Sequence, residues 1–356
     1  GHAKSAPESF ADLAEQLLPA VVNISTTQVV QAPGVQEMPD LPPGSPFEEW
    51  FKEFFEQREG QDAPSRRAQS LGSGFIIDSS GYVVTNNHVI EGADEIKVIL
   101  HDDTTLDAEI VGRDPKTDLA LLKVETATPL TAVTFGDSDD LRVGDWVIAI
   151  GNPFGLGGTV TAGIVSARSR DIRSGPYDDF IQTDASINRG NSGGPMFDMD
   201  GKVVGVNTAI YSPSGGSVGI GFAVPSNQVA SVVAQLKDFG RARRGWLGVH
   251  IQTVTEEIAE GLGLDSARGA LVASVNDDSP AAKGGIEQGD VILQFDSNEI
   301  ARMRELAPTV AETEIGKKVE VVVWRKGAEK SLNVVLGELR EDEQVASAPS
   351  APETAT

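Results

Sequence analysis

Short runs of β-branched and aromatic residues, separated by glycine, aspartate and asparagine, make up residues 71–224. Runs of this length bounded by turn-forming residues predict β-strands. Residues 21–27 (Val-Val-Asn-Ile-Ser-Thr-Thr) predict one more strand upstream. Many short strands joined by turns favour an all-β barrel arrangement for this part of the chain.

Two segments have the spacing of amphipathic helices instead. Residues 8–20 carry apolar side chains at helical intervals and stop near Pro19. Residues 226–240 place four apolar side chains on one face and end in glycine, as a helix that closes a domain does (Val229, Val232, Val233 and Leu236). The basic residues 241–244 that follow predict a hinge.

A long segment between the first strand and the barrel strands breaks the pattern. Residues 31–70 are rich in proline, glycine and charge, with one aromatic island at residues 47–55. Insertions of this length are usually functional or disordered. The island predicts either an amphipathic docking helix or a local helix packed on its own domain, and the sequence leaves both open.

The rest of the chain has a different organisation. Residues 245–339 alternate strands with helices, which predicts an α+β domain. We therefore expect domains at 8–240 and 241–340, followed by a flexible linker or tail at 341–356, which is rich in serine, alanine and proline. Residues 1–7 are interpreted as a scar and an N-terminal tail.

Composition narrows the possible partners. With 356 residues and 40% hydrophobic content, the chain is long enough for two or three domains. The net charge of −24 disfavours nucleic acid and anionic lipid. No apolar run approaches the roughly 20 residues of a membrane-spanning helix. Cysteine is absent, so disulfides and thiolate metal sites are excluded.

The most informative chemistry is at residues 190–195, Gly-Asn-Ser-Gly-Gly-Pro. Glycines beside Ser192 allow unusual backbone angles, so the turn can direct N–H groups toward one point. A serine needs a base to take its proton and donors to receive the resulting oxyanion. Taken alone, the segment also fits an ordinary surface turn.

The chain has four histidines, so the search for that base is short. His88 ends a run of two predicted strands, where we expect its ring to be held firmly yet stay accessible. His101 lies in a polar turn and His250 inside an apolar strand, and both are interpreted as structural. His2 belongs to the N-terminal scar.

A carboxylate must orient the histidine, and the chain has 53 acidic residues. Asp118 lies where a polar turn enters an apolar strand, so it can be partly desolvated, although a turn-capping role is also open. Asp184, just before the serine turn, is a competitor. The cluster Asp137, Asp139 and Asp140 is interpreted as solvated turn residues.

The order His88, Asp118, Ser192 is that of chymotrypsin-like proteases. Segments 85–89, 117–122 and 190–195 together resemble the protease domain of the HtrA/Deg family, with further agreement at 151–155, 182–185 and 219–225. The similarity runs from about residue 10 to about residue 339. It implies a mainly β fold, with His88 and Asp118 in one barrel of a trypsin-like double barrel and Ser192 in the other.

Residues 245–339 resemble a bacterial PDZ domain, with markers at 245–249, 279–283 and 289–292. The resemblance implies capture of peptide C-termini by strand addition, with backbone N–H groups of Leu247, Gly248 and Val249 on the carboxylate. A groove helix is expected at 303–312, with Leu306 and Val310 facing the peptide and Pro308 bending the helix or delaying its start. Arg243 or Arg244 is expected either to add positive charge near the bound carboxylate or to belong to the hinge. A second PDZ domain follows in many relatives.

The resemblance also implies further site residues and a function. The oxyanion would meet backbone N–H groups of Gly190, Asn191 and Ser192, and substrate backbone would pair with Thr208, Ala209 and Ile210. Ile187 and Ile210 would line a pocket for small aliphatic side chains. Arg189 would indicate whether the oxyanion loop is ordered, and residues 31–70 would match a loop that restrains a neighbouring subunit's active site.

We therefore expect an ATP-independent serine endopeptidase that degrades unfolded proteins in periplasmic quality control after removal of a signal peptide. It would assemble as a homotrimer or a cage of trimers, without cofactor, metal, nucleic acid or a membrane anchor. No Gly-rich phosphate loop is present in the sequence. The alternative is a chaperone or peptide-sensing protein with latent proteolysis.

Overall fold

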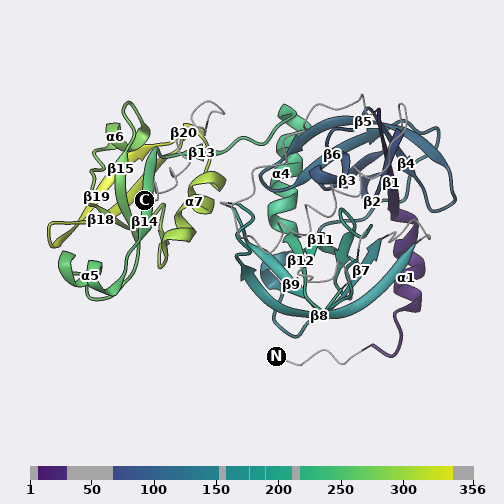
Figure 1. The fold of residues 1–356 in the computed structure, drawn as a ribbon, viewed down its shortest axis with the longest axis horizontal. Helices are drawn as coiled ribbons and strands as arrows, with labels where there is room; N and C mark the ends of the chain where they lie inside the picture. Colours follow the sequence, from purple (N-terminus) through teal and green to yellow (C-terminus); the bar gives the residue numbers. More distant parts are fainter. Residues whose placement is uncertain are drawn as a thin grey trace, which may run out of the picture. The chain divides into compact units, whose positions relative to one another are not determined.

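The computed structural model describes residues 7–29, 67–151, 158–175, 177–188, 190–210 and 217–339. The chain divides into two compact units, Gly1–Ala242 and Arg243–Thr356 (Figure 1). Each is considered by itself. The predictions for residues 1–6, 31–66, 340–356 and Arg189 lie outside the described residues.

Six strands of unit 1 close into a first barrel in the order β1-β2-β3-β6-β5-β4. Its strands are β1 (Val21–Val29), β2 (Arg67–Asp78), β3 (Tyr82–Thr85), β4 (Glu95–Ile99), β5 (Thr105–Asp114) and β6 (Leu119–Val124). A one-turn helix, α3 (Asn87–Ile90), follows β3. The last residues of the predicted insertion, 67–70, thus already belong to a strand.

A second barrel has the order β10-β11-β12-β9-β8-β7. It consists of β7 (Trp146–Gly151), β8 (Thr159–Arg170), β9 (Phe180–Thr183), β10 (Pro195–Phe197), β11 (Val203–Ile210) and β12 (Gly221–Pro225). A short 3₁₀ turn, η2 (Ser138–Asp140), precedes them. The predicted all-β barrel arrangement is therefore confirmed, as two closed barrels.

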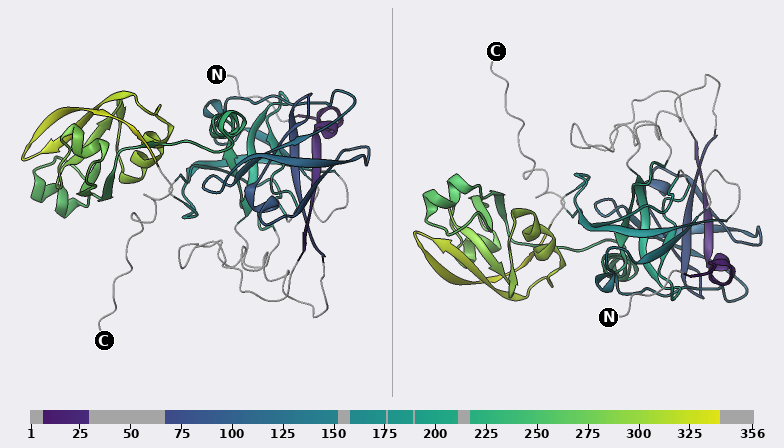
Figure 2. Two further views of the ribbon diagram at one scale, coloured as in Figure 1. Left: turned by 90° about the horizontal axis from the view of Figure 1, so that it is seen from above. Right: turned by 90° about the horizontal axis from the view of Figure 1, so that it is seen from below.

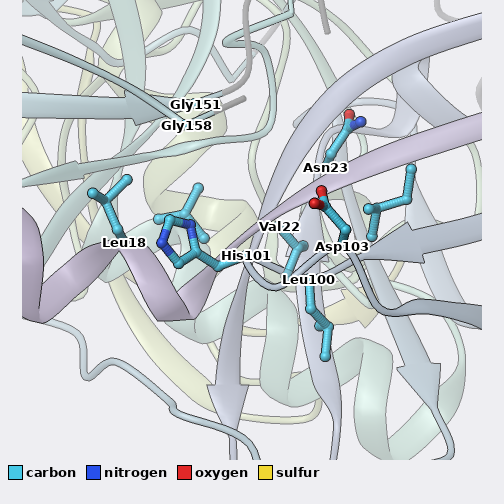
Figure 3. Close-up of a pocket in the computed structure, with 10 residues that line it drawn as sticks. Leu18, Val22, Asn23, Leu100, His101, Asp103, Gly151 and Gly158 are labelled. Atoms are coloured by element: carbon cyan, nitrogen blue, oxygen red, sulfur yellow. The ribbon is translucent and has the colours of Figure 1, made fainter. Parts of the chain in front are cut away.

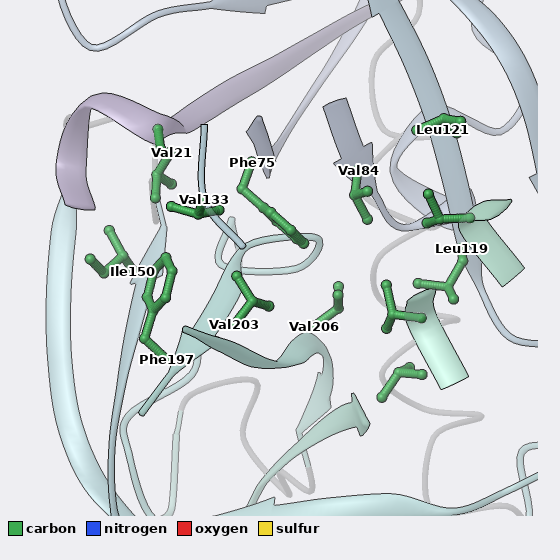
Figure 4. Close-up of a cluster of buried hydrophobic side chains, with 14 of the residues drawn as sticks. Val21, Phe75, Val84, Leu119, Leu121, Val133, Ile150, Phe197, Val203 and Val206 are labelled. Carbon is green, nitrogen blue, oxygen red and sulfur yellow. The ribbon is translucent and has the colours of Figure 1, made fainter. Parts of the chain in front are cut away.

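A shared apolar core joins the barrels (Figure 4). Phe75 and Leu121 of the first barrel and Ile150 and Phe197 of the second belong to one buried cluster. Full burial of such a side chain contributes about 1.5–3 kcal/mol. The two barrels are thereby fixed relative to each other, which a site built from both of them requires.

Helices close this unit as the sequence predicts. α1 (Ala11–Leu17) and η1 (Leu18–Ala20) lead into β1. α4 (Ser226–Phe239) contacts strands of both barrels and ends at Gly240 with a left-handed φ of 71° (Figures 1 and 2). Glycine adopts that conformation without the Cβ penalty, so the helix ends there.

Unit 2 contains one sheet in the order β14-β15-β16-β18-β19, with β17 paired to β16 and a separate pair β13-β20. The strands are β13 (Gly245–Trp246), β14 (Val249–Thr253), β15 (Ala270–Val275), β16 (Val291–Phe295), β17 (Asn298–Glu299), β18 (Lys318–Arg325), β19 (Ala328–Val335) and β20 (Gly337–Glu338). The helices are α5 (Glu256–Leu262), α6 (Pro280–Gly284) and α7 (Met303–Glu312). α7 has the predicted bounds and contains Pro308.

Candidate active site

Asp118 lies in the turn between β5 and β6 in a left-handed conformation, with φ of 56°. Thr117 donates its hydroxyl to Asp114 within the same turn. The Asp118 carbonyl accepts the backbone N–H of Asn87 at 3.0 Å and the side-chain amide of Asn86 at 2.7 Å. The turn is therefore fastened to the segment that carries His88.

The Asp118 carboxylate is the meeting point of three donors. His88 Nδ1 is 2.6 Å from Oδ2, the His88 backbone N–H donates to Oδ1 at 2.9 Å, and Thr208 Oγ1 donates to Oδ2 at 2.7 Å. A carboxylate on Nδ1 favours the tautomer with its proton there, which leaves the Nε2 lone pair to act as a base. The pair has the chemistry of an oriented general base.

The surroundings of His88 differ from the prediction of an accessible residue at a strand end. β3 stops at Thr85, and His88 lies in α3 with an exposed fraction of 2%. Val89 and Ile90, its neighbours in that helical turn, are buried in the first barrel's core. His88 and these two neighbours are therefore all buried.

Thr208 has a role that the sequence did not reveal. It was predicted to pair with substrate backbone, but its hydroxyl donates to Asp118. The β11–β12 register shifts between Asn207 and Ala209, so Thr208 occupies a bulge. A bulge re-aims the side chain that it carries, and nothing in the local sequence identifies this one.

Ser192 lies in a turn between β9 and β10, with an exposed fraction of 7%. The N–H of Gly193 donates to the Asn207 carbonyl at 2.8 Å, and the N–H of Asn207 donates to the Gly194 carbonyl at 2.9 Å. Asn207 therefore holds the serine turn while its neighbour Thr208 holds Asp118.

Close packing completes the junction between the barrels. Gly193 has a φ of 82°, and a Cβ there would lie 2.2 Å from the Ser73 carbonyl oxygen and 3.0 Å from the backbone nitrogen of Asn86. Only glycine fits such a position. The serine turn thus lies against the residues just before His88, and Asp118 is bonded to His88; the joint action of the three residues stays a prediction.

The predicted oxyanion donors separate into two kinds. Asn191 donates its N–H to the Asn188 carbonyl at 3.0 Å, so this donor is already engaged. Among the hydrogen bonds of the described residues, none uses the N–H of Gly190 or of Ser192. The role of Gly190, Asn191 and Ser192 as oxyanion donors stays a prediction, and of the three only Asn191 has its N–H engaged among the described residues.

The competing residues lie elsewhere. Asp184, the alternative acid, accepts the N–H of Ile164 at 2.7 Å. His250 contacts the Ser274 hydroxyl at 3.1 Å. His101 lines a pocket of about 230 Å³ that includes none of the three predicted catalytic residues (Figure 3).

The predicted specificity residues are partly brought together. Ile187 and Ile210 share a small buried cluster with Ala149 and Ala185, whereas Ala209 packs with Phe222. β11 pairs with β10 only as far as Val206, so within the described residues 208–210 have β12 as their one strand neighbour. Their role toward substrate stays a prediction.

In unit 2, β14 is an edge strand and α7 contacts it, so strand and helix border one edge of the sheet. Gly248 has a φ of 82°, and a Cβ there would lie 2.3 Å from the Ser279 Cβ. The carbonyls of Leu247 and Gly248 accept N–H groups of Ala281 and Asn276 at 2.8 and 2.9 Å, which fixes this backbone next to Val249.

The residues predicted to face a peptide from α7 are core residues. Leu306 and Val310 have exposed fractions of 1% and 6% and pack with Leu247. Their place in a peptide groove stays a prediction. Arg243 makes a two-point contact with Glu338 at 3.0 and 2.8 Å, and this hydrogen bond raises the pKa of its guanidinium.

Across the described ranges, no group of three or more histidine, cysteine, aspartate or glutamate side chains is arranged to hold a metal ion. No helix in the same part of the chain is long and apolar enough to cross a membrane.

Comparison with known proteins agrees with these observations. A family model described as a trypsin-like peptidase domain matches residues 72–206, and a PDZ domain model matches residues 245–336. The probable periplasmic serine endoprotease DegP-like of Brucella suis is 48% identical over 96% of this chain and 71% of its own length. Its counterpart from a Marinomonas strain is 52% identical over 94% of this chain and 72% of its own length.

A solved structure titled HtrA-type protease AlgW with decapeptide is 43% identical, with a TM-score of 0.76. The match covers 93% of this chain and 99% of that one. The chain belongs to the HtrA/DegP-like family of periplasmic serine endoproteases, with a trypsin-like peptidase domain followed by a PDZ domain.

Proposed function

We propose that the protein hydrolyses peptide bonds of unfolded proteins by acyl transfer, with Ser192 as nucleophile, His88 as general base and Asp118 as the orienting acid. The observation that carries this proposal is the Asp118 carboxylate, which holds His88 Nδ1 at 2.6 Å and is tied through Thr208 to the strand that also binds the serine turn.

In the first step Ser192 Oγ forms a bond to the scissile carbonyl carbon while its proton passes to His88 Nε2. The carbonyl oxygen becomes an oxyanion, which the N–H groups of Gly190 and Ser192 receive. Loss of one such donor typically costs about 10²–10³ in rate. Asp118 stabilises the imidazolium without taking its proton.

The C–N bond then breaks as His88 returns the proton to the leaving amine, which leaves an ester on Ser192. Water attacks this ester, its proton passes to His88, and collapse of the second oxyanion frees the new carboxylate and restores Ser192. The cycle needs neither ATP nor a cofactor. Among the described residues, β11 pairs with β10 only as far as Val206, and the lack of a second strand neighbour at 208–210 supports pairing with substrate backbone.

We assign the peptidase domain to residues 8–240 and the peptide-capturing domain to 241–340. Capture of a peptide C-terminus is supported by the edge strand β14 beside α7 and by the close approach that Gly248 permits. The AlgW structure carries a decapeptide by its title. A role in periplasmic quality control, as a homotrimer or a cage of trimers, completes the proposal.

The test is degradation of unfolded casein by the parent and by Ser192→Ala. Removal of the nucleophile is expected to lower kcat by about 10⁵–10⁶, because the triad acts as a unit. Asp184→Asn is the matched control, since that carboxylate is exposed and contacts the Ile164 backbone. Casein degradation by Ser192→Ala at the parent's rate would refute the proposal.

A further inference from the structure

Ser73 of β2 is fully buried and donates twice to the serine turn of the other barrel. Its backbone N–H donates to the Ser192 carbonyl at 2.9 Å, and its hydroxyl donates to the Gly190 carbonyl at 2.5 Å. The first contact needs only a backbone. The second depends on the identity of the side chain.

The hydroxyl contact fixes one particular peptide group, the one between Gly190 and Asn191. Its carbonyl is held by Ser73, and its N–H is held by the Asn188 carbonyl at 3.0 Å. Gly190 has a φ of 94°, a region in which glycine has little preference of its own. This peptide group, bound at both ends, lies between the two peptide groups that carry the N–H groups of Gly190 and Ser192, so it limits how either can turn.

Contacts on several sides hold Ser73 in place. Thr85 donates its hydroxyl to the Ser73 carbonyl at 2.7 Å, and Ser73 pairs with Asn23 of β1. A Cβ on Gly151 would lie 3.0 Å from the Ser73 hydroxyl, and one on Gly194 would lie 3.2 Å from the Ser73 Cβ. The donor is thus set rigidly on the first barrel and directed at a loop of the second.

We propose that Ser73 is a positioning residue for proteolysis: its hydroxyl holds the Gly190–Asn191 peptide group so that the N–H groups of Gly190 and Ser192 stay aimed at the oxyanion. It does not touch the substrate. This inference rests on the proposed acyl-transfer function. The proposed role of the hydroxyl also explains why residue 73 is a serine, although both of its neighbours, Gly72 and Gly74, are glycines.

A buried hydroxyl can also act only through stability, and the chain offers a matched control for that. Ser226 is equally buried and donates its hydroxyl to the Gly136 carbonyl at 2.7 Å, at the start of α4. Ser73→Ala and Ser226→Ala each leave one backbone carbonyl without its donor. Only the first affects the oxyanion loop.

The experiment measures kcat and KM on a peptide substrate, the rate of labelling by a fluorophosphonate, and Tm, for the parent and both variants. We expect Ser73→Ala to lower kcat and the labelling rate by about tenfold or more with KM within about twofold, because the oxyanion contact strengthens in the transition state. Ser226→Ala is expected to keep the parent's kcat. Ser73→Cys, which retains a weak donor, is expected to fall between Ser73→Ala and the parent.

Unchanged kcat in Ser73→Ala, or equal losses in both alanine variants, would overturn the inference. If Ser73→Ala does not fold, Ser73→Cys provides the test. A Ser73→Cys variant with the parent's kcat and a lower Tm would show that Ser73 acts through stability and would contradict the inference. The labelling rate distinguishes failure of the proposed function from failure of this inference. A parent that does not react at Ser192 defeats the proposed function, whereas a reactive parent with an equally reactive Ser73→Ala defeats only this inference.

Discussion

Asp118 is held by side-chain and backbone donors to its charged carboxylate, whereas Ser192 lies in a turn held by uncharged hydrogen bonds, among them that of the Ser73 hydroxyl, and by glycines that leave no room for a Cβ. The half of the site around Asp118 thus depends on hydrogen bonds to a charged group. The half around Ser192 depends on uncharged hydrogen bonds and on close packing of the backbone. The aspartate half should therefore respond to substitutions that change charge at constant volume. The serine half should respond to substitutions that add volume without changing charge.

The largest effect is expected where charge is removed at constant volume. In Asp118→Asn, one carboxylate oxygen becomes an NH₂ group, while both oxygens are needed as acceptors, Oδ2 for His88 Nδ1 and Thr208 Oγ1 and Oδ1 for the His88 backbone N–H. We expect kcat to fall by about 10⁴, measured on a peptide substrate, with the fold retained. Parental activity in this variant would mean that Asp118 is only a turn residue.

Added volume should damage the other half. In Gly193→Ala the new Cβ would lie 2.2 Å from the Ser73 carbonyl oxygen, so the turn has to move. A displacement of that kind costs about 10² in kcat. Gly144→Ala is the control, since Gly144 also has a positive φ, of 96°, but has nothing within 4 Å of its Cβ position. Equal losses in the two variants would show that backbone strain, and not the packing on Ser73, matters at Gly193.

A smaller effect is expected at the residue that links the halves. Thr208→Val removes the hydroxyl that donates to Asp118 and keeps the branched shape. A hydrogen bond to a charged group contributes about 1.5–3 kcal/mol, so kcat should fall by about 10- to 100-fold. Thr208→Ser restores the donor and should recover most of the rate. Full activity of Thr208→Val would show that the hydrogen bond from Thr208 to Asp118 does not contribute to catalysis.

The smallest effect concerns a carboxylate outside the three proposed catalytic residues. Asp178 accepts N–H groups of Ile172 and Ser174 and the Ser174 hydroxyl, as Asp118 accepts three donors. Burial outweighs these bonds and raises the pKa of Asp178 above its ordinary value of 3.8. The folded state then binds more protons than the unfolded state, so the free energy of unfolding falls as pH rises through this window.

The check is Tm of the parent and of Asp178→Asn between about pH 4 and about pH 7. The parent's Tm should fall relative to that of the variant as pH rises. A constant difference, or one that grows in the parent's favour, would show that burial does not dominate at Asp178.

Much of the site could be predicted because its members lie in separate, recognisable segments. The order of His88, Asp118 and Ser192 and the glycines around the serine were readable along the chain. An all-β barrel arrangement and α4 followed from the sequence pattern, whereas the division into two barrels and the bounds of α7 followed from the family resemblance. Each of these features is local, or is carried by a short motif.

What could not be predicted depends on contacts between distant segments. The role of Thr208 comes from a bulge in β11, and that of Ser73 from the meeting of two barrels, 117 residues apart in sequence for its hydroxyl contact. The burial of His88 belongs to the one-turn helix α3, whose four residues are all buried at the first barrel. In α7, the burial of Leu306 and Val310 against Leu247 was also not predicted, and their role in a peptide groove stays a prediction from the resemblance.

The most direct test of the central claim is the site of covalent labelling by a fluorophosphonate, located by peptide mass spectrometry in the parent and in His88→Ala. The account predicts a single adduct on Ser192 in the parent and a labelling rate lower by several orders of magnitude in the variant, because the serine then has no base. An adduct on another residue, or labelling of Ser192 that is equally fast without His88, would contradict it.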